Sequence, residues 1–173
     1  KNPLTITGIA SGKTVKYLSG GRSEGAAGGA VNNTVNLVGT GAGTLEEVYG
    51  GYIGKTTNSA NATGNTVNIA GGTVQTVYGG YTNGTGKTTG NTVNIGYMDE
   101  HGAFHAVADG TRVTGTIYGG KSGDVTGNTL NVRGALTAGQ IANFEKLNFA
   151  VNKDLAGKTL LSINGTAATT GLD

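Results

Sequence analysis

Residues 90–95 read Gly-Asn-Thr-Val-Asn-Ile, and they follow a Val-Tyr-Gly-Gly phrase at residues 77–80. The same pair of phrases occurs three more times, the first of them degraded, at residues 18–21 with 33–37, 48–51 with 65–69, and 117–120 with 128–132. The Gly-Gly pairs are spaced by 30, 29 and 40 residues along the chain. Repeats of this length with strand-like content are typical of solenoids, propellers and arrays, so the sequence predicts a stack of similar units.

The phrase at 90–95 predicts a strand with one buried face. Because successive side chains of a strand point to opposite faces, Asn91, Val93 and Ile95 share one face, and Thr92 and Asn94 share the other. The two apolar residues identify the first face as the interior. A turn is expected just before the strand, because glycine adopts a positive φ there without steric cost.

A second strand is expected before each Gly-Gly pair, around Val74 and Val77 and their counterparts. The pair that follows, at 79–80, is likewise predicted to turn the chain. A unit of two or three short strands cannot bury its own apolar face, whereas units stacked at about 4.8 Å bury it together. A propeller fits less well, because each blade needs four strands and residues 119–140 offer about two.

Stacking would align equivalent residues of successive units in columns. Inward asparagines are expected to form a ladder, bonded to one another and to the turn backbone, at Asn33, Asn65, Asn91 and Asn128. Aromatic rings are expected to stack at Tyr49, Tyr78 and Tyr118. Outward polar side chains are expected to form an exposed strip that can pack against another copy or a glycan, at Thr66, Asn68, Thr92, Asn94, Thr129 and Asn131.

The predicted fold class is therefore all-β, a parallel β-helix (β-solenoid) of about four repeat coils plus terminal coils, forming a single domain over residues 1–173. Its expected parts are a first strand in 1–14, repeat units at 15–47, 48–76, 77–116 and 117–140, and terminal coils at 141–173. In the terminal coils, Leu147, Phe149 and Val151 alternate with polar residues and are expected to point inward.

The composition excludes several classes of protein. The chain has 34 Gly but only one Pro, and its glycines do not recur every third residue, which excludes collagen. A net charge of +2 without a basic patch argues against a nucleic-acid partner. The absence of Cys excludes disulfides and thiolate metal sites. No run of about 18 apolar residues is present, so neither a transmembrane segment nor a signal peptide is expected.

An insertion at residues 96–112 interrupts the third repeat and holds both histidines and the only methionine. Insertions in solenoids map to loops on one face, which often binds. The candidate binding loop comprises Asp99, Glu100, His101, Phe104, His105 and Asp109. A helical loop would place both histidines on one face, with Asp99 as a further ligand for a divalent metal. Simple solvation of a polar loop is the alternative, and we predict no metal and no cofactor.

No catalytic signature is evident in the sequence. The ten acidic residues are scattered, although an enzyme acting on glycosides needs carboxylates that converge on one groove. The pair Glu46 and Glu47 is interpreted as a solvated strand edge. No Gly-x-Ser-x-Gly phrase is present, so a serine hydrolase is not indicated. We therefore predict that the chain is not an enzyme.

The repeated phrases, followed by Phe-Glu-Lys-Leu-Asn-Phe at 144–149 and Gly-Lys-Thr-Leu-Leu-Ser-Ile at 157–163, resemble a known family. They are similar to the C-terminal β-helix portion of autotransporter (type V secretion) passenger domains of Gram-negative bacteria. The resemblance covers about residues 15–167. It implies a right-handed parallel β-helix that is exported across the outer membrane and is extracellular or displayed on the bacterial cell surface.

The family includes adhesins, aggregation factors and proteases, so the resemblance alone does not decide the activity. Because no catalytic signature is evident, we predict a non-catalytic adhesin or structural stalk. The expected partners are a protein or glycan on a host cell or neighbouring cell, or copies of the chain itself. Two alternatives stay open. One is a self-assembling extracellular filament subunit whose ends stack between protomers, and the other is a carbohydrate-active enzyme on the same scaffold.

Overall fold

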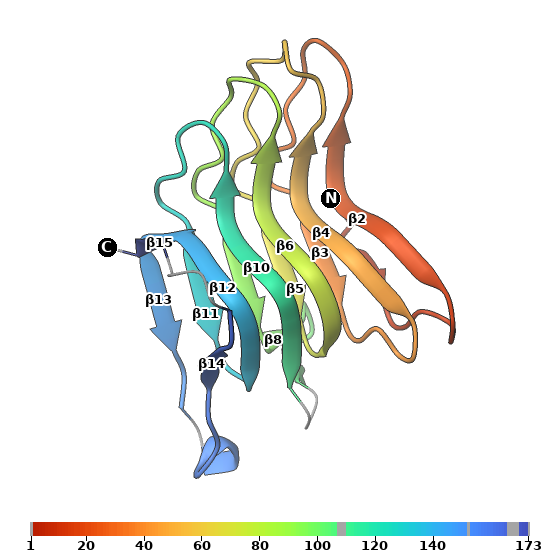
Figure 1. Ribbon diagram of the computed structural model, residues 1–173, viewed down its shortest axis with the longest axis vertical. Coiled ribbons are helices and arrows are strands. Elements are labelled where there is room, and N and C mark those ends of the chain that lie inside the picture. The colour runs from red at the N-terminus through yellow and green to blue at the C-terminus, as the bar shows by residue number, and fades with distance from the viewer. Residues whose placement is uncertain (1, 107–109, 152, 166–169, 173) are drawn as a thin grey trace.

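The chain folds into a stack of coils in which two parallel sheets face each other (Figure 1). The computed structural model describes residues 2–106, 110–151, 153–165 and 170–172. The short-strand sheet contains six strands, in the spatial order β1 (Leu4–Ile6), β3 (Thr34–Leu37), β5 (Thr66–Ile69), β7 (Thr92–Ile95), β11 (Thr129–Val132) and β13 (Lys146–Phe149).

The long-strand sheet forms the opposite wall and curves across the front of Figure 1. Its strands follow the order β14 (Leu161–Ile163), β12 (Leu136–Phe144), β10 (Thr111–Lys121), β6 (Gly72–Thr82), β4 (Thr44–Ile53) and β2 (Thr14–Ser23), and β15 (Thr170–Leu172) also pairs with β12. The remaining elements are the hairpin β8 (Tyr97–Met98) with β9 (Phe104–His105) and the 3-10 helix η1 (Lys153–Leu155). The predicted parallel β-helix is thereby confirmed.

The core lies between the two sheets and consists of columns of equivalent residues. One column contains Val35, Val67, Val93 and Leu130, which are paired in register along the short-strand sheet and are completely buried. The facing wall contributes Val48, Val77, Ile117 and Ile141. β-Branched residues suit these positions because they pack well on a pleated surface. Each coil therefore buries its apolar face only against its neighbours.

The inward asparagines form a ladder at the corner where each short strand begins. Asn65 donates both its backbone N–H and its side-chain Nδ2 to Oδ1 of Asn91, at 3.0 Å each. The second hydrogen of Asn65 Nδ2 goes to the carbonyl oxygen of Ala30 at 2.8 Å. Asn33 makes the same pair of bonds to Asn65, and Asn91 makes them to Asn128. Each interior amide is thus satisfied without water.

The Gly-Gly pairs do not turn the chain, and this prediction was wrong. Residues 50–51 and 79–80 lie inside β4 and β6, and none of these glycines has a positive φ. A Cβ atom at Gly50 would meet Cβ of Asn65 at 2.9 Å and the carbonyl oxygen of Gly79. The glycines are therefore needed because the inner ladder packs directly on their backbone. The turn before the short strand is made by Gly90, which does have a positive φ of 64°.

The end of the chain departs from expectation in one respect. The phrase at 144–149 continues the short-strand sheet, since β13 pairs in register with β11. Phe149 and Val151, expected inside, are nevertheless 46% and 72% exposed. Among the described residues β13 is the edge strand of its sheet, so no further coil covers its last side chains. The long strands also cross the repeat boundaries drawn at residues 48, 77 and 117.

Replacing Gly79 by Ala should destabilise the protein by about 1–3 kcal/mol, the usual cost of overpacking a close contact. The new Cβ would lie 2.8 Å from Cβ of Asn91 and against the carbonyl oxygen of Gly119. Gly39→Ala is the matched control, because nothing lies within 4 Å of its Cβ position. Urea denaturation of both variants measures the difference, and equal midpoints would contradict the packing role of the Gly-Gly pair.

Asn91→Ala should cost about 2–5 kcal/mol, because it leaves the buried N–H groups of Asn65 without their acceptor. The matched control is Asn94→Ala, three residues away on the outer face of the same coil. Water can replace the lost partner there, so this variant should lose less than about 1 kcal/mol of unfolding free energy. Thermal unfolding compares the two. If the outer variant proved the more damaging one, the inner ladder would not be a principal support of the fold.

Candidate functional site

The outward asparagines also form a ladder, on the solvent side of the short-strand sheet. Asn68 Nδ2 donates to Oδ1 of Asn36 at 2.8 Å, and Asn94 donates to Asn68 at 2.7 Å. Asn131 and Asn148 continue the series with bonds of 2.7 and 2.9 Å. The sequence pattern placed three of these residues outward but missed their mutual bonding and the members Asn36 and Asn148. Both occupy the matching position of their own phrase, which is the signal that identifies them.

The outer ladder still offers hydrogen-bonding groups to a ligand. An asparagine amide has two N–H donors and two acceptor lone pairs, and the ladder engages one of each. The outward threonines Thr34, Thr66, Thr92 and Thr129 run beside it in register and are partly exposed. The strip therefore presents hydroxyl and amide groups, without charge, at the repeat distance of a parallel sheet.

The insertion is a β-hairpin and not a helix, so the two histidines do not share a helical face. In this hairpin, Tyr97 pairs with His105 and Met98 pairs with Phe104. His101 lies in the turn with its side chain 83% exposed. Asp99 closes that turn, because its Oδ1 accepts the backbone N–H of His101 and of Ala103, each at 2.9 Å.

A short pair holds the base of the hairpin. Nε2 of His105 lies 2.7 Å from Oδ2 of Asp99, and the two side chains are 33% and 24% exposed. The His105 ring stacks on the buried ring of Tyr97, with centroids 5.2 Å apart. The hydrogen bond from His105, followed by that from the Ala103 N–H, lowers the pKa of Asp99 from 3.8 to about 2. Its carboxylate is therefore ionised and already committed to three protein groups at neutral pH.

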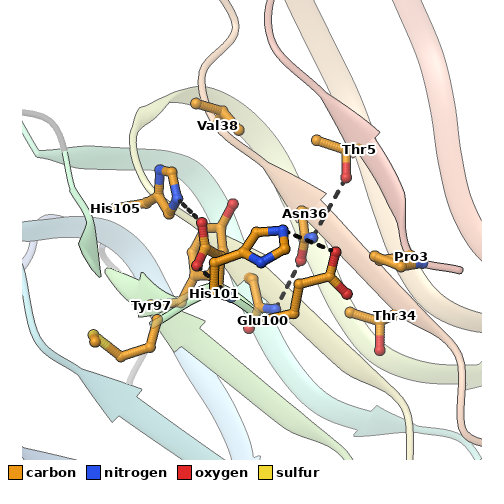
Figure 2. Close-up of a pocket in the computed structure, with 12 residues that line it drawn as sticks. Pro3, Thr5, Thr34, Asn36, Val38, Tyr97, Glu100, His101 and His105 are labelled. Carbon is orange, nitrogen blue, oxygen red and sulfur yellow. Dashed lines mark hydrogen bonds and ion pairs between the residues drawn. The ribbon is translucent and has the colours of Figure 1, made fainter. Parts of the chain in front are cut away.

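The hairpin and the outer strip meet at a groove of about 420 Å³ (Figure 2). Its floor is the outer face of the short-strand sheet, where Thr5, Thr34, Asn36 and Asn68 line it. Its wall is the insertion, which contributes Tyr97, Met98, Asp99, Glu100, His101 and His105. Pro3 and Val38 complete the lining. A groove of this size falls in the range of about 300–1,000 Å³ that is usual for small-molecule sites.

The other predicted site residues lie elsewhere. Phe104 faces a second, apolar hollow of about 240 Å³ with Met98, Arg133, Ala150 and Val151. The rest of the predicted strip, at Thr66, Thr92, Asn94, Thr129 and Asn131, continues outside the groove lining. Asp109 lies outside the described residues. Within the described part of the chain, no three His, Asp or Glu side chains are grouped so that they can hold a metal ion.

The tyrosines stack on the outer face of the long-strand sheet. The Tyr49 and Tyr78 rings are 4.8 Å apart and nearly parallel, and Tyr78 and Tyr118 are 5.2 Å apart. A second column, which sequence reasoning missed, pairs Tyr52 with Tyr81 at 5.4 Å. Because the rings stack on one another, their faces are already occupied and are not an open platform for a sugar ring.

Charged side chains complete the tyrosine columns. Arg22 lies over the Tyr52 ring at 4.6 Å, and Lys121 lies over the Tyr118 ring at 4.4 Å. The hydroxyl of Tyr49 donates to Glu47 at 2.6 Å. Burial, with a smaller contribution from the Glu47 charge, raises the pKa of Tyr78 to about 12. These cation–π and hydrogen-bonded contacts indicate that the tyrosine columns stabilise the fold.

Comparison with known proteins finds no family model that matches the chain and no significant match among curated proteins or solved structures. Within the described ranges, no helix is long and apolar enough to cross a membrane.

Acid should loosen the insertion hairpin. Because the folded state lowers the pKa of Asp99, its contribution is complete above the ordinary value of 3.8 and is lost as the pH falls towards about 2. Hydrogen exchange at the amides of His101 and Ala103, followed by NMR from pH 7 to pH 2, should show protection declining within that window. The Asp99→Asn variant, which cannot ionise, should lack this acid transition. Protection that is unchanged at pH 2 in the wild type would contradict the role of Asp99.

Proposed function

We propose that the chain is a non-catalytic β-helix of the passenger-domain type, which acts outside the cell as an adhesin or structural stalk and associates with copies of itself or with a neighbouring surface. The observation that carries this proposal is the unbroken stack of coils. Two asparagine ladders couple the repeat coils to one another, and the apolar core is continuous between them. Such a stack is stiff along its axis and presents a long, regular side surface.

The outer strip supports an adhesive role. Its amides and hydroxyls lie in register on a flat sheet face and retain unused donors and acceptors. Flat polar arrays of this kind suit contact with a second array or with a glycan, because many weak contacts form together.

A binding role fits the chemistry of the groove better than catalysis. With a pKa of about 2, Asp99 carries no proton at neutral pH and cannot serve as a general acid. Both of its carboxylate oxygens are engaged by groups of the hairpin itself. The insertion therefore uses this carboxylate to shape a wall.

Beads coated with the purified chain should cluster with one another or bind bacterial or host cells, whereas beads coated with heat-denatured chain should not. Introducing charge on the strip, as Thr92→Lys with Thr129→Lys, should reduce the clustering by repulsion between facing copies. The charge-matched control is Thr73→Lys with Thr114→Lys, two exposed positions on the other sheet. Beads that remain dispersed and bind no cells would contradict the proposal.

A further inference from the structure

We infer that the groove between the insertion hairpin and the outer strip binds a neutral saccharide of about two sugar units. The inference rests on the proposed adhesive function and names the class of ligand that this groove would take. The groove volume of about 420 Å³ suits a ligand of this size.

The floor of the groove matches the hydrogen-bonding pattern of sugar hydroxyls. Thr34 and Thr5 supply hydroxyls that both donate and accept, and Asn36 and Asn68 supply amides with both kinds of group. The Asn36 amide is fixed because its Oδ1 accepts from Asn68 at 2.8 Å. Side chains that are already ordered lose little entropy when a ligand arrives.

The backbone turn and the base of the wall are also held in place. Asp99 holds the turn through the N–H groups of His101 and Ala103, and the buried Tyr97 ring supports His105. Glu100 and His101 lie at the rim, with side chains 75% and 83% exposed, and Oε1 of Glu100 is 3.6 Å from Nε2 of His101. Both line the same groove as the strip residue Asn36 (Figure 2), so they can contact a ligand that lies on the floor.

The charge of the lining selects against acidic ligands. Asp99 and Glu100 are carboxylates, and the lining includes no Lys or Arg. Each carboxylate is paired with a histidine of the same lining, at 3.6 Å for Glu100 with His101 and 2.7 Å for Asp99 with His105. An acidic sugar would therefore meet two carboxylates that already have partners, and no Lys or Arg to bind its own charge. The floor is the face of a sheet in which β1, β3 and β5 pair with one another, so a peptide lying on this face cannot add to it as a strand.

The test is titration calorimetry with the whole chain and defined probes. Lactose, cellobiose and N,N′-diacetylchitobiose represent neutral disaccharides, and 3′-sialyllactose represents an acidic one. At least one neutral probe should bind saturably, and sialyllactose should not. In NMR spectra, the neutral probe that binds should also shift the side-chain amide signals of Asn36 and Asn68.

Thr34→Val removes a floor hydroxyl while keeping the side-chain shape and should weaken binding about fivefold, the effect of one hydrogen bond. Thr73→Val makes the same change at an exposed position on the long-strand sheet, outside both the groove and the strip, and should leave the affinity unchanged. Failure of every neutral probe, equal binding of sialyllactose, or equal effects of the two variants would overturn the inference. Clustering of coated beads without saccharide binding would remove this ligand but keep the adhesive function. If the chain bound a saccharide but its beads neither clustered nor bound cells, the saccharide site would be kept and the adhesive function would be lost.

Discussion

A buried asparagine amide is costly unless all its hydrogen-bonding groups are paired, and in this protein the pairing comes from the next coil. Oδ1 of Asn91 accepts two N–H groups of Asn65, and Nδ2 of Asn91 donates onward to Asn128. The ladder holds each coil at one height and in one register relative to its neighbour. A slip by one residue would place Val93 in the solvent and an outward threonine in the core.

The ladder also explains the glycine content beside it. The side chain of each inner asparagine packs on the backbone of a Gly-Gly pair in the facing long strand, and a Cβ there would collide with it. Where the ladder ends, the Gly-Gly pair is replaced by Asn143 and Phe144. Asn143 donates to the carbonyl oxygen of Gly120 at 2.9 Å, and Phe144 is buried beside Gly119. The Gly-Gly pair therefore recurs where an inner asparagine packs on it.

The periodicity of the sequence predicts those features of the fold that depend on local rules. The alternation in residues 91–95 determines which side chains are buried, and stacking determines which of them meet, so the core columns and the inner ladder follow from sequence. The role of Gly79 did not follow, because a close approach between sheets is a tertiary property that a positive-φ rule cannot detect. The bonding among Asn36, Asn68 and Asn94 was missed for a similar reason, since exposure does not reveal whether an amide has a partner. The insertion at residues 96–112 has no repeat to read, and its hairpin depends on contacts of Asp99 and Tyr97 that no spacing encodes.

The position of the groove follows from the regularity around it. A parallel sheet with identical side chains in register has a flat outer face, and a flat face binds small ligands poorly because it cannot surround them. Concavity on this side of the solenoid therefore requires an interruption of the repeat. The insertion leaves the short-strand sheet just after Ile95, with Tyr97 buried as its anchor, and forms a wall beside the strip. The ladder supplies a rigid floor and the interruption supplies the enclosure, so selectivity at this site depends on the least repetitive residues of the chain.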